Sequence, residues 1–211
     1  MGDELYLRKM EEADEPPPKA GPLSATQMAR YVKRYQTRFA LKTLVTRQRG
    51  THARGVGAIG TVTVLDNPHL PEHDFFNAGH VYPVRLRHAN LVRPDDAQLD
   101  VRAVSLKFDD SDFKSPFDLM MHTGEEAAFW NIFSFDKMIT ALAGGPKTFK
   151  AFCLEDPWNF HLAIAVFRRG LDSFTDQRYY SWMAFEYKAK DGVPRYAKFR
   201  LVPADDREET G

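Results

Sequence analysis

His52 is the residue of this chain whose surroundings are best suited to acid–base chemistry. It lies in residues 49–60, which read RGTHARGVGAIG and contain four glycines. An imidazole exchanges its proton near neutral pH, so a histidine can pass a proton between two atoms of a substrate. Glycines have no side chain and let a flat ligand approach the backbone closely. The segment therefore predicts His52 as a catalytic residue, with a purely structural histidine as the alternative.

The spacing Gly55-x-Gly57-x-x-Gly60 also occurs in dinucleotide-binding loops. Those loops follow a strand and open a helix, because the pyrophosphate binds at the helix N-terminus. Here the order is reversed, since residues 25–44 have helical periodicity and residues 61–65, TVTVL, favour a strand. The context argues against a dinucleotide site.

A run of basic residues leads into this segment. No acidic residue occurs between Glu15 and Asp66, whereas eight Lys and Arg side chains lie in residues 30–54. Such a run binds an anion or is a solvated helix face. We favour the solvated face for the helix, and favour binding more for Arg49 and Arg54, which flank His52. A nucleic-acid interface over residues 29–54 stays open as an alternative.

Three further histidines lie together in one loop. His69, His73 and His80 are interspersed with Glu72 and Asp74. They lack the spacing of a ligand pair on a helix, which is the usual sign of a metal site. We therefore predict a polar surface loop and no metal site.

The composition favours a soluble cytoplasmic protein. The 211 residues include 29 basic and 29 acidic side chains, and this zero net charge gives no global indication of a nucleic-acid partner. Cys153 is the single cysteine, which excludes an internal disulfide and predicts a buried, inert thiol in an apolar run. The sequence has no secretory signal pattern and no run long enough to span a membrane.

The secondary-structure signals predict an α+β protein. Residues 1–23, rich in acidic residues and proline, predict a flexible arm, and residues 24–211 a folded domain. Ser24 with Gln27, and Thr123 with Glu126, match the capping box that begins helices. Helices are predicted at 25–44, after Thr123, at 137–143 and at 156–169, and antiparallel strands at 61–65, 81–86, 101–108, 117–121, 179–187 and 195–202.

Four strings in order resemble the haem-binding core of the catalase superfamily. They are THARGVGAIGTVTV, VYPVRLRHANL, LDVRAVSLKFDD and SPFDLMMHTGEEAAFWN. Catalases have H-A-R-G or H-A-K-G at the first string. The preceding threonine and the string R-H-A-N are similar to the catalase-related allene oxide synthases, which occur fused to lipoxygenases. The resemblance implies a catalase-like antiparallel β-barrel with an N-terminal helical arm and inserted helices. This chain would form the N-terminal portion of that haem-binding domain.

The resemblance also implies roles for individual residues. His52 would lie on the distal face of haem b and move a proton between peroxide oxygens, with Thr51 beside it restraining hydrogen-peroxide chemistry. The implied reaction is the dehydration of a fatty-acid hydroperoxide to an allene epoxide. This is a lyase reaction of oxylipin metabolism, with a lipoxygenase, fused or separate, as partner. Arginine side chains suit the haem propionates. The expected cofactor-binding residues are Arg49, Arg54, Val56, Gly57 and Arg87.

Two positions depart from the family pattern. His122 stands where the family has a distal asparagine, and it becomes a candidate catalytic residue because an imidazole can replace an amide donor. None of the eight tyrosines matches the proximal tyrosine that ligates haem iron. A catalase-like module that has lost haem chemistry and binds a partner is therefore the alternative. An incomplete barrel would leave apolar surface uncovered, so we also expect self-association.

Overall fold

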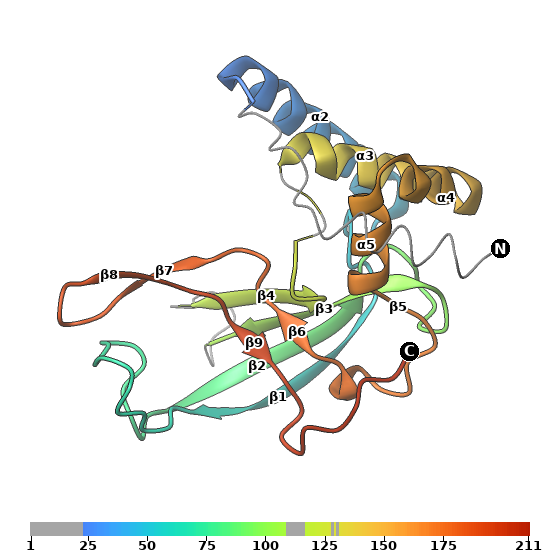
Figure 1. The fold of residues 1–211 in the computed structure, drawn as a ribbon. Coiled ribbons are helices and arrows are strands. Elements are labelled where there is room, and N and C mark those ends of the chain that lie inside the picture. Colours follow the sequence, from blue (N-terminus) through green and yellow to red (C-terminus); the bar gives the residue numbers. More distant parts are fainter. Residues whose placement is uncertain (1–22, 109–116, 128, 130) are drawn as a thin grey trace. The chain divides into compact units, whose positions relative to one another are not determined.

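The computed structural model describes residues 23–108, 117–127, 129 and 131–211. The predicted arm at residues 1–23 lies outside this part apart from its last residue. The chain divides into two compact units, a helical unit of Met1–Thr51 and Glu126–Phe167 and a sheet unit of His52–Glu125 and Arg168–Gly211. Each unit is described by itself below, with the element labels of Figure 1.

The helical unit contains four helices in the described residues. They are α2 (Ala25–Thr46), α3 (Ile132–Ala143), α4 (Pro146–Glu155) and α5 (Pro157–Val166) (Figure 1). The predicted helix at 25–44 is confirmed, and Ser24 and Gln27 form the predicted capping box. Pro146 begins α4, and the Asp156 side chain caps α5 by accepting from Trp158 N. No described helix combines the length and the apolar character needed to cross a membrane.

One predicted helix start is wrong. Thr123 does not cap a helix but ends strand β4, where it is fully buried and its hydroxyl accepts a hydrogen bond from the Arg102 backbone N–H at 3.1 Å. Asn131 caps α3 instead, with Ser134 as the reciprocal partner. Tertiary burial of Thr123 therefore overrides a capping pattern that is valid only locally.

Asp136 of α3 accounts for part of the basic run in α2. Its carboxylate accepts from the Tyr35 hydroxyl at 2.9 Å and pairs with Arg34 at 3.1 Å and Arg38 at 3.3 Å. Burial, and then the bond to Asp136, raises the pKa of Tyr35. Lys42 donates to the carbonyl of Gly50 at 2.6 Å. These contacts give three cations of the run partners within the helical unit, so the predicted solvated face describes only part of the run.

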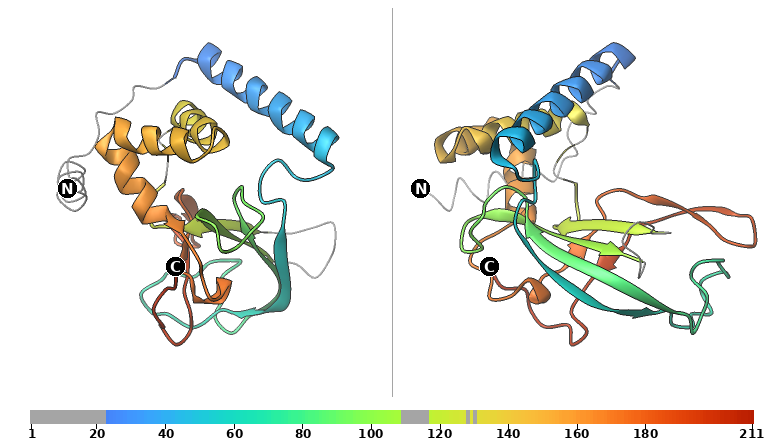
Figure 2. Two further views of the ribbon diagram at one scale, coloured as in Figure 1. Left: turned by 90° about the vertical axis from the view of Figure 1, so that its right-hand side faces the viewer. Right: turned by 180° about the vertical axis from the view of Figure 1, so that it is seen from behind.

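The sheet unit is an antiparallel half-barrel. Its strands follow the order β1-β2-β3-β4-β6-β9, and each neighbouring pair is antiparallel. Figure 2 shows the curvature of this sheet. The strands are β1 (Gly55–Thr63), β2 (Val81–Asn90), β3 (Asp100–Lys107), β4 (Asp118–Thr123), β6 (Tyr179–Tyr180) and β9 (Arg200–Leu201).

Four shorter elements complete the described chain. They are β5 (Phe167–Arg168), the 3-10 helix η1 (Phe174–Asp176), and the hairpin strands β7 (Phe185–Lys188) and β8 (Pro194–Ala197). The predicted turn at Asp191-Gly192 is confirmed, with Gly192 at φ +73°. The predicted strand at 179–187 is divided into β6 and β7. The predicted helix at 156–169 ends at Val166, because β5 begins at the next residue.

The core of the half-barrel lies against one face of the sheet. Its buried residues are Val84, Val104, Leu106, Phe108, Leu119, Met121 and Tyr179. In contrast, β1 is exposed along almost its whole length, with Val56 61% and Ile59 87% exposed. The first strand, which begins within residues 49–60, therefore presents an open apolar surface.

Candidate functional site

The backbone of His52 is held in an uncommon conformation. Its φ of +52° lies in the left-handed region, which few residues other than glycine adopt. The His52 N–H donates to the Leu91 carbonyl at 2.9 Å, and the His52 carbonyl accepts from Arg87 Nη2 at 2.8 Å. Both partners belong to β2 or follow it directly. Two bonds to the neighbouring strand thus fix the backbone from which the imidazole projects.

Gly55 makes the contact with Arg87 possible. A Cβ atom at position 55 would lie 2.8 Å from Arg87 Cζ and Nη2, and closer still to the His88 carbonyl oxygen. Real Cβ atoms do not approach other atoms so closely, so this position requires glycine. Gly57 has only the Leu86 carbonyl within 4 Å of such an atom, at 3.8 Å, and Gly60 has no described atom within that distance. Of the three glycines in the motif, only Gly55 is needed for close packing.

His122 brings a second imidazole to His52. The two ring centroids are 5.7 Å apart with 51° between the ring planes. His122 also stacks on Trp182, with ring centroids 4.3 Å apart and 22° between the ring planes. The Trp182 indole N–H donates to the Gly124 carbonyl at 2.9 Å, which anchors the stacking partner. Two histidines from distant parts of the sequence therefore form one cluster.

Burial keeps the His122 ring neutral. Loss of solvation, and then the proximity of His52, lowers the pKa of His122 to about 3. A neutral imidazole carries one N–H donor and one acceptor nitrogen. The pair can therefore combine a proton-transferring group at His52 with a fixed neutral hydrogen-bonding group at His122.

Comparisons with known proteins identify relatives of this chain, although no protein-family model matches it. It is 36% identical over 215 residues to the allene oxide synthase-lipoxygenase protein of Plexaura homomalla, covering all of this chain and 20% of that protein. It is 30% identical over 184 residues to linolenate 9R-lipoxygenase of a Nostoc species, covering 83% of this chain and 23% of the relative. The chain is a catalase-related homologue of the allene oxide synthase-lipoxygenase protein.

The fold of this catalase-related homologue agrees with that relationship. A crystal structure of a fungal catalase superposes with a TM-score of 0.58 at 15% identity, over 89% of this chain and 40% of the catalase chain. The likeness shows a catalase-like fold that covers part of the solved chain. The homologue spans about a fifth of the length of the curated relatives it matches.

The other predicted site residues of the homologue lie in different settings. Arg54 and Val56 are exposed at the start of the sheet unit. Arg49 and Thr51 precede His52 in the chain and belong to the helical unit. No group of three or more potential metal-ligating side chains occurs among the described residues, including the loop with His69, His73 and His80.

Trp182 and Leu91 are residues of the site that sequence reasoning did not find. Trp182 lies between β6 and β7, and Leu91 lies just after β2. The Leu91 contact is made by the backbone, which carries no residue-specific signal. The Trp182 contact depends on the pairing of β6 with β4, which brings Tyr180 opposite His122. Neither could be read from local periodicity.

His88 of the string R-H-A-N is a buried core residue in the homologue. Its ring lies between Phe174, at 5.4 Å and 22°, and Tyr179, at 5.4 Å and 41°. Its Nδ1 is buried and makes no hydrogen bond with the part of the chain that the structure describes. Burial lowers the pKa of His88 to about 4. This second neutral imidazole packs against aromatic rings and is not part of the His52–His122 cluster.

The lowered pKa values of His88 and His122 predict a loss of stability in mild acid. In the unfolded chain each titrates near 6.5, whereas in the fold the pKa is about 4 for His88 and about 3 for His122. Between these values the unfolded chain binds more protons, so the free energy of unfolding falls as pH decreases. The expected loss is up to about 1.4 kcal/mol per pH unit for each histidine below about pH 6.5.

Urea unfolding at about pH 7.5, about pH 6 and about pH 5 measures this slope, and His88→Phe is the matched variant. The variant replaces one ring by another and is expected to lower the slope below about pH 6.5 by roughly half. Carboxylates contribute equally to both proteins and cancel in the comparison. Equal slopes for the two proteins would contradict a depressed pKa at His88.

Proposed function

We propose that this chain supplies the distal side of a haem-dependent site that dehydrates fatty-acid hydroperoxides. The observation that carries the proposal is the His52–His122 cluster, in which two imidazoles from distant segments lie 5.7 Å apart. The relationship to an allene oxide synthase-lipoxygenase protein supports the choice of reaction. The substrate class and the reaction of the whole relative are carried to this chain only as part of the proposal.

The distal residues fit a flat macrocycle. Val56 is exposed, and Gly57 presents no side chain beside it. Arg87 uses one donor for the His52 carbonyl, but a guanidinium has five donors, so this bond does not exclude a propionate partner. We therefore propose Val56 and Gly57 as the wall against the ring, and Arg54 and Arg87 as partners of its carboxylates. Arg49 and Thr51 complete the proposed set.

The tyrosines with a perturbed pKa do not fit an axial tyrosinate ligand. Tyr35, Tyr82 and Tyr179 donate their hydroxyls to Asp136, Phe75 O and Phe174 O, respectively. Burial raises the pKa of all three, whereas a tyrosinate ligand needs a lowered pKa. None of these three tyrosines is therefore a candidate axial ligand, and the role proposed for this chain is on the distal side.

The proposed chemistry divides between the two imidazoles. Haem, when bound, would supply the redox chemistry that breaks the oxygen–oxygen bond. His52 would move a proton at the peroxide oxygens, and water would form when the departing hydroxyl gains the proton that a carbon of the fatty-acid chain loses. His122, held neutral and oriented by Trp182, would hydrogen-bond a peroxide oxygen without adding positive charge. In this respect it would act as an asparagine amide does.

Haem titration tests the proposal. We expect a Soret band when haem is added together with imidazole, which would serve as an axial ligand. We expect His52→Ala to shift the band and to slow the consumption of a linolenate hydroperoxide by about 100-fold or more, the usual contribution of a positioned acid–base group. His80→Ala removes an exposed loop histidine and serves as the matched control. A band that is absent, or that is unaltered in His52→Ala, would overturn the proposal.

Substitution of His122 tests its assigned role separately. His122→Asn keeps a neutral donor and acceptor, and we expect it to retain haem binding and hydroperoxide turnover within about threefold of the unaltered chain. His122→Phe keeps the aromatic stack but removes the hydrogen bond, and we expect about a tenfold loss or more. Equal activities of the two variants would remove His122 from the proposed chemistry.

A non-catalytic module is the second candidate function. The open apolar face of β1 favours it, because an exposed strand is a surface that a partner can cover. In that case no haem would bind under any of the conditions above, and the His52 variants would leave partner binding unchanged. The haem titration therefore distinguishes the two candidates.

A further inference from the structure

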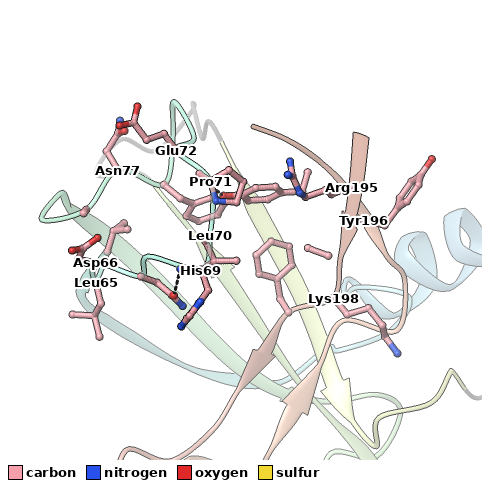
Figure 3. Close-up of a pocket in the computed structure, with 17 residues that line it drawn as sticks. Leu65, Asp66, His69, Leu70, Pro71, Glu72, Asn77, Arg195, Tyr196 and Lys198 are labelled. Carbon is pink, nitrogen blue, oxygen red and sulfur yellow. Dashed lines mark hydrogen bonds between the residues drawn. The ribbon is translucent and has the colours of Figure 1, made fainter. Parts of the chain in front are cut away.

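A separate cavity lies at the opposite end of the sheet unit from His52. It has a volume of about 630 Å³ and lies between the loop of residues 64–78 and the β7–β8 hairpin (Figure 3). His52 precedes β1, whereas Val64 follows it. The nine residues of β1 span about 26 Å at a rise of about 3.3 Å per residue. The cavity is therefore distinct from the His52–His122 cluster.

Hydrogen bonds across the walls define the shape of this cavity. The Lys190 N–H donates to the Glu72 carbonyl at 2.8 Å, and the Tyr187 hydroxyl donates to the Pro71 carbonyl at 3.3 Å. At the base of the loop, the Val64 carbonyl accepts from Gly79 N–H at 2.8 Å. These bonds hold the loop to the hairpin and close the base of the loop. The cavity between the loop and the hairpin therefore has fixed walls.

Aromatic side chains form much of the interior. Phe76 stacks on Tyr187 with ring planes 15° apart and contacts Phe199 at 6.1 Å between centroids. A second cavity of about 280 Å³ shares Phe76, Tyr187, Ala197 and Phe199 with the first, and extends toward Phe117. A cavity of about 630 Å³ is within the usual size range of small-molecule sites, which are lined mainly by apolar and aromatic side chains. The aromatic lining suits an apolar ligand chain.

Exposed side chains continue this apolar surface to the mouth of the cavity. Leu65 is 80%, Leu70 61% and Tyr196 78% exposed, although all three line the cavity. Large apolar side chains that gather around a concave site indicate a ligand that covers them. Isolated surface leucines would not surround one opening.

The charges around the mouth select a carboxylate at one end of the ligand. Glu72 is paired with Lys190 at 3.4 Å, and Arg195 is paired with Asp191 at 2.7 Å. Lys198 has no carboxylate partner in the part of the chain that the structure describes, and its ammonium donates to the Glu125 carbonyl at 3.0 Å. In Figure 3 Lys198 lies on the same side as Arg195 and Tyr196, and Asp66 lies on the side of Leu65.

We propose that this cavity binds a long-chain fatty acid, with its chain between the loop and the hairpin and its carboxylate at Lys198. Such a site is separate from the proposed distal site and requires neither haem nor His52. It would hold a fatty acid on the same sheet unit that carries the proposed chemistry, at the other end of β1.

Fluorescence titration with cis-parinaric acid, a fluorescent polyunsaturated fatty acid, tests the site in the full chain. We expect saturable binding that linolenate displaces. Leu70→Asp places a charge at the exposed mouth and Ala197→Trp fills the space shared by both cavities, so each is expected to weaken binding at least about tenfold. Thermal melting of both variants verifies that they remain folded, and Leu70→Asp changes a side chain that is 61% exposed.

Substitution of the lysine tests recognition of the carboxylate. Lys198→Met is expected to weaken linolenate binding about 3- to 10-fold, because a partly exposed ion pair contributes modestly. It should leave the competition by linolenyl alcohol, which has no charge, unchanged. Lys188→Met removes a charge from an exposed strand position outside the cavity and serves as the matched control. Equal effects of the two lysine variants would overturn the assignment of the head group.

The outcome also separates this inference from the proposed function. Binding that is unaffected by Leu70→Asp and Ala197→Trp overturns the cavity as a fatty-acid site. The cavity is also overturned as the site if binding is lost in His52→Ala but kept in the two cavity variants, because that result places the ligand at the His52–His122 cluster. A Soret band that fails to form would overturn only the proposed function, since parinarate binding is measured without haem.

Discussion

Replacing Gly55 by alanine is expected to destabilise the sheet unit by about 1–3 kcal/mol, the usual cost of adding a methyl group to a close-packed site. The new Cβ would lie 2.8 Å from the Arg87 guanidinium and nearer still to the His88 carbonyl oxygen. A backbone carbonyl within a paired strand cannot move away without breaking the pairing of β1 and β2. The variant must therefore either separate the strands or expel Arg87 from its place against His52.

Gly60→Ala is the matched control, because position 60 is also in β1 but a Cβ there would have no described atom within 4 Å. We expect its free energy of unfolding to stay within about 0.5 kcal/mol of the unaltered chain, or to rise slightly. Urea unfolding measures both variants. A Gly55→Ala protein as stable as Gly60→Ala would contradict the close contact of Gly55 with β2.

The same substitution is expected to affect the candidate site. The Arg87 bond to the His52 carbonyl is one of two bonds that hold His52 at φ +52°. If Gly55→Ala displaces the guanidinium, the imidazole of His52 loses its fixed position beside His122. The nuclear magnetic resonance signals of both imidazoles should then shift in Gly55→Ala and stay unchanged in Gly60→Ala. Stability and site geometry thus depend on the same glycine.

Local signals in the sequence were sufficient for several helix ends and strands. Ser24 with Gln27 and Asp156 with Pro157 act through bonds to residues two or three positions away, so their patterns are visible in a short window. The β-prone segments after Gly60 were found for the same reason. Even so, β1 begins at Gly55, six residues before the predicted strand. Glycines have low strand propensity, and the pairing with β2 overrides it.

The candidate site depended on information of a different kind. Neither spacing nor periodicity relates His52 to His122, and only the resemblance to a known family suggested that both belong to one site. The structure adds Trp182, whose stacking on His122 follows from strand pairing. The structure also shows that Arg87 donates to the backbone carbonyl of His52. From the sequence, Arg87 was assigned to a cofactor carboxylate, and this contact was not predicted. Contacts between distant segments are decided by tertiary packing, which single-sequence patterns do not encode.

Replacing Arg102 by methionine is expected to cause the largest loss of stability, about 3–5 kcal/mol, which is typical when one member of a buried charged network is removed. Arg102 is fully buried in β3. Its guanidinium donates to Asn90 Oδ1 at 2.6 Å and to the carbonyls of Asp96 at 2.8 Å, Gln98 at 2.7 Å and Arg168 at 3.0 Å. Methionine has a similar length but no donor, so all four acceptors would lose this partner, and the buried Asn90 side chain would lose it inside the fold.

The charge of Arg102 also compensates a buried carboxylate. Asp100 is 1% exposed, and burial raises its pKa, whereas three backbone N–H donors and Arg102 act in the opposite direction. Removing the cation leaves Asp100 harder to ionise, which adds to the loss of the four hydrogen bonds. Arg102→Lys keeps a cation but not the planar fork, so we expect it to be intermediate between methionine and arginine.

Arg200→Met is the control for the change in side-chain chemistry, since Arg200 is exposed on β9. We expect it to alter the free energy of unfolding by less than about 0.5 kcal/mol. If Arg102→Met were no more destabilising than Arg200→Met, the hydrogen bonds of Arg102 would contribute nothing net. The bonds from Arg102 to the Asp96 and Gln98 carbonyls hold the loop of residues 91–99 against β3. In that case other contacts would have to fix the conformation of this loop. Because Leu91 at the start of this loop also accepts the His52 N–H, loss of Arg102 should loosen the backbone of His52 as well.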